Sequence, residues 1–317
     1  MPQDLAVYSD ADDYSGAWDE PLRILFKLIK PCNLRFDGDA PISHLLVHLQ
    51  CERVKKLFLP YHDVDTKEGE RSWLDILSRS AATVVELTVN GSAMSILSIQ
   101  EYQAEIPFCP NLRTLRSTTT ISHNMSLEDR MLFDTDAYET LISKHAAQLT
   151  DLDFAPFQFS RNMKLSEIAE LPKLATLRLH YLIPSEEEAG HEDEEEAHDN
   201  STWLYSLYEF EQLQDLAAFP SIRNLIFSRY DSAVQHMRLM WAVHRLLQNA
   251  YWLPKLSKIY IPDFRFDGRD RDDKELFFQA ALEHEDTFYK LSAALEARKI
   301  ELTGDLVETM ERWCPRV

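Results

Sequence analysis

The chain is poor in glycine and cysteine, and this scarcity argues against several classes of protein. Only seven of its 317 residues are glycine, and there is no Gly-rich phosphate loop, dinucleotide-binding fingerprint or Gly-x-Ser-x-Gly nucleophile turn. The four cysteines are isolated from one another, which predicts buried thiols in a reducing compartment and argues against a disulfide framework or a zinc knuckle: Cys32, Cys51, Cys109 and Cys314. We therefore expect no cofactor and no enzymatic activity.

Long apolar runs and a basic leader are also lacking. No run approaches the roughly 18 apolar residues that a membrane-spanning helix needs. Residues 1–20 carry six acids and neither Lys nor Arg, the opposite of a signal or transit peptide. The sequence therefore predicts an intracellular protein, cytoplasmic or nuclear, that does not associate with membranes.

Acidic residues are abundant, but they are concentrated in two segments. The formal net charge is −20, and residues 186–199 alone hold nine acids without one Lys or Arg. Such composition predicts an acidic disordered tail over residues 1–20 and an acidic disordered loop over residues 185–201. A net-negative surface repels phosphate backbones, so we expect no nucleic-acid partner.

A short apolar pattern, apolar-x-x-apolar-x-apolar, recurs along the rest of the chain. Its copies occupy residues 54–59, 84–89, 112–117, 149–154, 174–179, 222–227 and 256–261, with a degenerate copy at 298–302 centred on Ile300 and a candidate capping strand at 32–36. The intervals between copies are longer and less regular than the 20–29 residues of typical leucine-rich repeats. Each copy is expected to form one short strand.

The segments between the copies have helical periodicity. Apolar residues three or four positions apart predict helices over 136–148, 203–219, 232–253 and 272–297. Four copies follow a Pro that would end the preceding helix: Pro110, Pro172, Pro220 and Pro254. The predicted fold is α/β, a leucine-rich-repeat solenoid with a curved parallel sheet inside and helices outside, forming a single domain over residues 21–317 with a cap at each end.

Several phrases resemble leucine-rich-repeat proteins, in particular the fungal F-box family. They are PNLRTLR, LPKLATLRLHYL, FPSIRNLIFSRY and LPKLSKIYIPDF, within about residues 50–302. The F-box is a helical module that opens with a Leu-Pro phrase, and residues 21–50 have its apolar content without its pattern. The resemblance implies a repeat fold, and it implies one possible role, substrate recognition in a ubiquitin ligase of F-box type.

Alternation along each strand predicts which side chains face a partner. The residues between the core positions, and those just after the strand, should lie on the concave face. The predicted contact residues include aromatic side chains and Arg, which commonly anchor interfaces: Phe58, Thr88, Arg116, Asp153, Arg178, His180, Ile226, Tyr230, Tyr260 and Glu301. We expect a non-enzymatic interaction scaffold, recognition subunit or adaptor that binds a protein partner, as a monomer or within a hetero-complex.

Other interpretations stay open. The 186–199 run could make the protein an acidic chaperone or a binder of a basic client. His44 and His48 lie four apart, as helical metal ligands do, but Leu45 stands where a zinc protease has Glu, and ordinary packing accounts for them better. Residues 267–275 resemble a calcium loop only in composition, and His191 and His198 are at most weak metal ligands. An enzyme would need a group such as His44, His145, His180 or His244.

Overall fold

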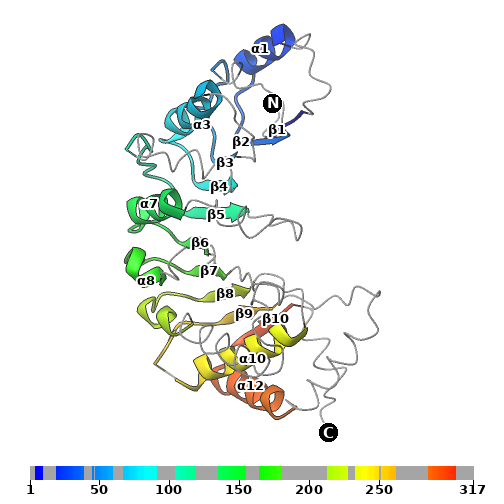
Figure 1. Cartoon of the computed structure of the whole chain (residues 1–317), viewed down its shortest axis with the longest axis vertical. Helices are drawn as coiled ribbons and strands as arrows, with labels where there is room; N and C mark the ends of the chain where they lie inside the picture. Colours follow the sequence, from blue (N-terminus) through cyan, green and yellow to red (C-terminus); the bar gives the residue numbers. More distant parts are fainter. Residues whose placement is uncertain are drawn as a thin grey trace, which may run out of the picture. The chain divides into compact units, whose positions relative to one another are not determined.

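The computed structural model describes twelve segments of the chain, and its elements alternate between strand and helix. The described residues are 4–9, 19–38, 45, 47–59, 67–90, 104–118, 135–154, 164–179, 213–227, 233–249, 251–261 and 285–304. All ten strands are parallel, and their order in the sheet is their order in the sequence, β1 to β10 (Figure 1). This confirms the predicted α/β class with a parallel sheet, and each described copy of the apolar pattern forms one strand.

The contacts divide the chain into two compact units. The N-terminal unit is Met1–Asp153 with Gln158–Arg161 and Ile168–Lys173; the C-terminal unit is Phe154–Phe157, Asn162–Glu167 and Leu174–Val317. The N-terminal unit holds β1 (Asp4–Ser9), α1 (Asp19–Leu28), β2 (Asn33–Gly38), β3 (Lys56–Leu59), α3 (Lys67–Ser80), β4 (Glu86–Asn90), β5 (Thr114–Thr118), α7 (Thr135–His145) and most of β6 (Asp151–Phe154). The sequence predicted one domain.

The C-terminal unit contains shorter strands. Its elements are β7 (Thr176–Leu179), the 3-10 helix η4 (Leu216–Ala218), β8 (Asn224–Phe227), α10 (Ala233–Gln248), β9 (Lys258–Tyr260), α12 (Glu285–Arg298) and β10 (Glu301–Thr303). The short helix α8 (Leu165–Ile168) has residues assigned to both units. Helices α10 and α12 contact each other (Figure 1). Of the predicted 203–219 helix, only residues 213–219 are described, and they contain η4.

The strands are held by one hydrogen-bond arrangement that recurs from repeat to repeat. We call the middle apolar residue of each copy of the pattern its central residue, which is Leu34 in β2. The carbonyl of Cys32, two residues before Leu34, accepts the N–H groups of Lys55 and Lys56 at 2.7 and 3.1 Å. The carbonyls at the same position of the following repeats do likewise, each toward the next strand: Lys55, Val85 and Arg113 in the N-terminal unit, and Ala175 and Arg223 in the C-terminal unit. Because the same bonds recur, neighbouring strands are in the same register, and within each unit the central residue of one strand pairs with the central residue of the next.

The chain enters its strands in two ways. In the repeats of β4 and β6 a helix leads almost directly into the strand, and Val84 and Leu149 still donate to the carbonyl four residues earlier, on Ser80 and His145. In the repeats of β5, β8 and β9 a Pro intervenes, and the same position donates to the carbonyl three residues earlier, on Cys109, Phe219 and Leu253. The Pro phrases therefore mark tight turns before the strands.

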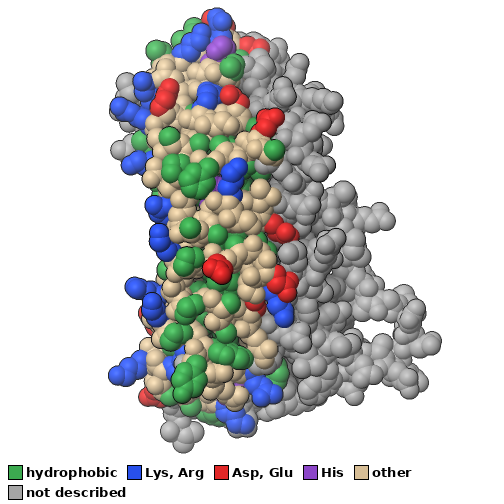
Figure 2. Space-filling view, turned by 90° about the vertical axis from the view of Figure 1, so that its left-hand side faces the viewer, with side chains coloured by type: hydrophobic (Ala, Val, Ile, Leu, Met, Phe, Trp, Pro, Cys, Tyr) green, Lys and Arg blue, Asp and Glu red, His purple; other side chains and the backbone are tan. Residues whose placement is uncertain are grey.

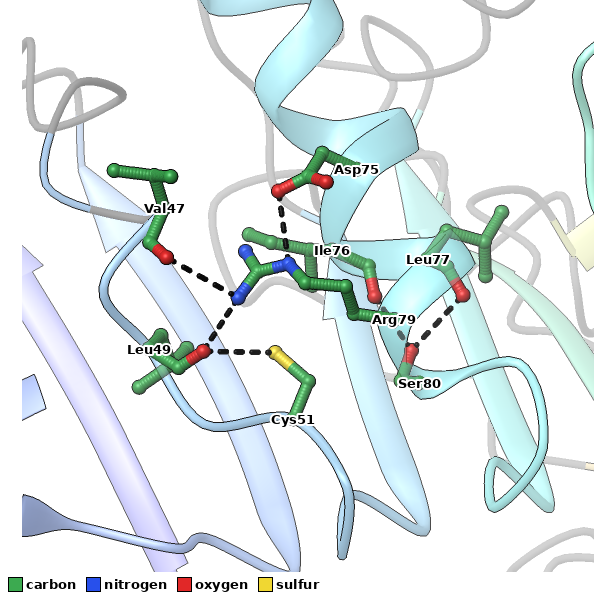
Figure 3. Close-up of polar contacts among 8 residues, drawn as sticks. All are labelled: Val47, Leu49, Cys51, Asp75, Ile76, Leu77, Arg79 and Ser80. Atoms are coloured by element: carbon green, nitrogen blue, oxygen red, sulfur yellow. Dashed lines mark hydrogen bonds and ion pairs between the residues drawn. The ribbon is translucent and has the colours of Figure 1, made fainter. Parts of the chain in front are cut away.

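An arginine on α3 ties the segment before β3 to that helix. Arg79 Nη1 donates to the Leu49 carbonyl at 2.5 Å and lies 3.5 Å from the Val47 carbonyl, while Nε pairs with Asp75 at 2.8 Å (Figure 3). Ser80 closes the helix by donating to the Ile76 carbonyl at 2.8 Å. A guanidinium has five donors in a fixed plane, so one side chain can hold three acceptors from two segments.

Two expectations from the sequence need correction. Residues 4–9, placed by their acidic surroundings in a disordered tail, form β1 and pair with β2 from Asp4↔Asn33 to Ser9↔Gly38. The last strand is also shifted, because Leu302 and not Ile300 pairs with the central Ile259. Lys299 has a φ of 54°, and this left-handed turn moves Ile300 into the core position that precedes the strand.

Candidate interaction surface

Each strand presents two side chains on the sheet face away from the core. In β3 the central Leu57 and the following Leu59 are buried. On either side of Leu57, Lys56 is exposed and Phe58 is half-buried. We call the residues just before the central position the first column: Asn33, Lys56, Glu86, Thr114 and Asp151 in the N-terminal unit, and Thr176, Asn224, Lys258 and Glu301 in the C-terminal unit. The residues just after it form the second column.

In the N-terminal unit, ion pairs join side chains across three strands. Glu86 of β4 pairs with Lys56 of β3 at 3.0 Å and with Arg116 of β5 at 3.3 Å, each carboxylate oxygen holding one cation. Exposed ion pairs contribute only about 0.2–1 kcal/mol each to stability. Their effect is to fix the positions of long side chains, so that this part of the face is ordered in advance.

Phe58 is the aromatic member of the second column in the same unit. The guanidinium carbon of Arg35, on the neighbouring strand β2, lies 4.7 Å from the centre of the Phe58 ring. A cation over a ring face is attracted by the negative face of the π system. The contact leaves Phe58 half-buried, as an aromatic surface flanked by a positive charge.

In the C-terminal unit, the second column runs Arg178, Ile226, Tyr260 and Thr303. Tyr260 is 36% exposed, and Arg178 and Ile226 are half-buried. The first column beside it is joined by polar contacts, Asn224 Nδ2 donating to Thr176 Oγ1 at 3.1 Å and Lys258 lying 3.5 Å from Glu301. The face thus offers aliphatic and aromatic surface beside charges of both signs.

The structure places some of the ten predicted contact residues in the second column, as expected, but not all of them. Phe58, Arg116, Arg178, Ile226 and Tyr260 lie in the second column as expected. Glu301 does not, because the shift of β10 places it in the first column, where it pairs with Lys258. His180 and Tyr230 lie outside the described residues.

Two members of the second column are too buried to offer a partner much surface. Thr88 is 9% exposed and Asp153 is 5% exposed. Behind Asp153, the Tyr138 hydroxyl of α7 donates to the Asp153 carbonyl at 2.7 Å, and burial together with the nearby Asp153 and Asp151 raises the pKa of Tyr138 well above its usual range. Alternation along a strand gives the direction of these side chains, but it does not predict how far their neighbours cover them.

His145 is the histidine whose environment the structure defines best. It is 1% exposed, at the C-terminus of α7, and its ring stacks on Phe108 with centroids 5.4 Å apart. Nε2 accepts the Cys109 N–H at 3.0 Å, and Nδ1 lies 2.8 Å from the Leu141 carbonyl, so Nδ1 carries the proton. Burial lowers the pKa of His145. With both ring nitrogens bonded to backbone, this imidazole holds α7 to the turn before β5 and has no atom left for proton transfer.

The described cysteines are unreactive thiols. Cys51 and Cys109 are buried, Cys32 is half-buried, and all three are free. Burial raises the pKa of both Cys51 and Cys109 to about 11, so the nucleophilic thiolate is scarce at neutral pH. This agrees with the expectation of isolated, buried thiols; Cys314 lies outside the described residues.

Other sites considered from the sequence fall partly or wholly outside the described segments. His44, His191, His198, the 186–199 run and the 267–275 loop are all outside them. Within the described segments there is no cluster of His, Cys, Asp or Glu suited to a metal ion. In the same segments, no helix combines the length and the apolar character needed to cross a membrane.

The chain was compared with known proteins in two ways. No protein-family model matches it, and the search of curated proteins finds no significant relative.

Proposed function

We propose that this chain is a leucine-rich-repeat solenoid that works without catalysis, recognising a protein partner on the outward face of its sheet. The repeat supports the fold, since each described copy of the apolar pattern supplies one strand, and six of these strands are preceded by a carbonyl that accepts two N–H groups at the start of the next strand. Repeat proteins of this kind commonly use an extended sheet face as a binding surface.

The observation that carries the binding role is the composition of the two columns. Arg and aromatic side chains are enriched among the residues that dominate binding energy. Two aromatic side chains lie at least partly exposed on this face: Phe58, which has Arg35 over its ring, and Tyr260. The fold does not require aromatic residues there, because a small polar residue would also fit an outward strand position. The Lys56–Glu86–Arg116 pairs hold the surrounding charges in place, which lowers the entropy lost on binding.

Binding is tested by a variant in which both units lose their anchors. The partner is first recovered by co-purification with the full chain and identified, and its affinity for the purified chain is then measured by calorimetry. Phe58→Ala, Arg178→Ala and Tyr260→Ala together should weaken binding about a hundredfold, since each anchor is expected to contribute at least about 1 kcal/mol. The thermal unfolding temperature should change little, because none of the three is fully buried.

A matched control removes exposed side chains outside both columns. Tyr251→Ala, Val47→Ala and Lys27→Ala take away comparable apolar and charged surface, and Tyr251 is 91% exposed. This variant should bind like the unmodified chain. Retained affinity in the folded column variant, or equal loss in both variants, would show that the partner binds elsewhere.

A further inference from the structure

The residues that come just before the strands carry charge of one sign only. We consider, for the strands β2 to β10, the residues that lie two, three and four positions before the central residue. These positions contain nine Lys or Arg and not one Asp or Glu, in a chain that has 53 acids and 33 bases. The nine are Lys30, Arg53, Lys55, Arg113, Lys173, Arg223, Lys255, Arg298 and Lys299.

Two of the nine bind the protein's own backbone. The Arg298 guanidinium donates to the carbonyls of Trp252 and Leu253, each at 2.9 Å, and Arg113 donates to the Leu112 carbonyl at 3.0 Å. The other seven are exposed, and within the described part of the chain none of them forms an ion pair. We call these seven the basic strip: Lys30, Arg53, Lys55, Lys173, Arg223, Lys255 and Lys299.

Six of the seven strip residues precede strands that are neighbours within one unit. In the C-terminal unit, Arg223, Lys255 and Lys299 precede the successive strands β8, β9 and β10, and neighbouring strands lie about 4.8 Å apart. In the N-terminal unit, Lys30, Arg53 and Lys55 precede β2 and β3, which also pair directly. Figure 2 looks onto the side where the strands begin and shows Lys and Arg side chains exposed on it.

Helix dipoles do not account for this pattern. Cations are favoured within the last turn of a helix, where carbonyl groups point outward. Helices α3 and α7, of 14 and 11 residues, lead almost directly into β4 and β6, yet the three positions before those strands hold no base. Lys255, by contrast, lies seven residues beyond the end of α10. Like charges on neighbouring strands repel one another, so the strip is not explained by stability of the fold.

We propose that the basic strip is a second docking surface, which binds an acidic peptide segment of a partner protein. Carboxylates complement Lys and Arg, and the nearby acid Glu301 is already engaged by Lys258. A nucleic acid fits less well, because the chain's net charge of −20 repels a dense polyanion at long range. A short acidic peptide has a lower charge density and can approach one unit alone.

The strip is separate from the columns proposed above as the protein-binding face. It lies before the strands, and none of its residues belongs to either column. Loss of peptide binding therefore leaves the column proposal unaffected, and the reverse is also true.

The probe is a fluorescein-labelled peptide of alternating Glu and Ser, followed by fluorescence anisotropy with the full chain. It should bind in about 50 mM NaCl and bind much more weakly in about 300 mM, since the shorter Debye length screens exposed charges. Arg223→Ser, Lys255→Ser and Lys299→Asn together should weaken binding about tenfold, the sum of three exposed ion pairs. Asn at residue 299 tolerates the positive φ found there.

The control removes three bases that are not members of the basic strip, by Lys27→Ser, Lys164→Ser and Lys290→Ser, and so changes the net charge equally. It should weaken peptide binding by less than about twofold, because net charge acts only weakly at this salt. Equal losses in both variants, or no peptide binding at low salt, would overturn the proposal. Tighter binding of labelled oligothymidylate, or of phosphatidylserine-containing vesicles, lost in the same strip variant, would instead assign the strip to that polyanion.

Discussion

Replacing Leu225 with Ala should lower the free energy of unfolding by about 3 kcal/mol, whereas replacing the next residue, Ile226, should cost about 1 kcal/mol or less. Leu225 is the fully buried central residue of β8, and Ile226 is a half-buried member of the second column. Truncating Leu225 removes buried methyl groups and leaves a cavity, while truncating Ile226 removes surface that water already reaches in part.

The pair is a sensitive test because the two residues are adjacent in one strand. Urea unfolding of both variants, followed by far-UV circular dichroism, should show a large fall in midpoint for Leu225→Ala at unchanged m-value. The opposite order of effects would mean that β8 is turned over. The residues assigned to the two columns would then form the core.

Replacing His145 with Ala should cost about 3 kcal/mol at neutral pH, because the Cys109 N–H loses its acceptor inside the protein and the ring leaves a cavity. The same side chain should make stability depend on pH. Its pKa is lowered by burial, whereas in the unfolded chain it is near the ordinary value of about 6.5. Protonation therefore favours the unfolded chain.

The direction of the pH effect follows from this shift. The stabilisation from neutral His145 is complete above the unfolded pKa of about 6.5 and is lost as the pH falls below it, by at most about 1.4 kcal/mol per pH unit. The difference in unfolding free energy between the native chain and His145→Ala should thus narrow from pH 7 to pH 5. His244 is the comparison, because burial also lowers its pKa but the side chain is less completely buried. The difference in unfolding free energy between the native chain and His244→Ala should therefore narrow less from pH 7 to pH 5. An unchanged difference for His145 would mean that the imidazole is not held neutral.

The strands could be predicted because their apolar spacing has a direct physical cause. Residues such as Leu57 and Leu59 must both enter the core of a one-strand repeat, and they are buried in the structure. Among the described strands, the spacing predicts the wrong register only at β10. There the backbone at Lys299 turns left-handed, and the residue that pairs with Ile259 is Leu302, two positions after the predicted Ile300. A left-handed φ at a lysine leaves no clear signal in the sequence.

The outward face was less predictable than the core. Strand alternation places Phe58 and Tyr260 outward, but it did not show that Arg35 covers the Phe58 ring or that Thr88 and Asp153 are buried. Strand β1 was missed because its acidic surroundings outweighed the short run Leu5-Ala6-Val7-Tyr8, which pairs with β2. Cross-strand contacts of this kind depend on neighbours distant in sequence.

The most direct measurement is hydroxyl-radical footprinting of the chain, alone and in complex with the co-purified partner. Phe58 and Tyr260 are aromatic side chains of the second column, one in each unit, and Tyr251, at 91% exposure and outside both columns, is the internal reference. The proposed function predicts that oxidation of Phe58 and Tyr260 falls several-fold in the complex while Tyr251 is oxidised as before. Unchanged oxidation of Phe58 and Tyr260 in a saturated complex would contradict it.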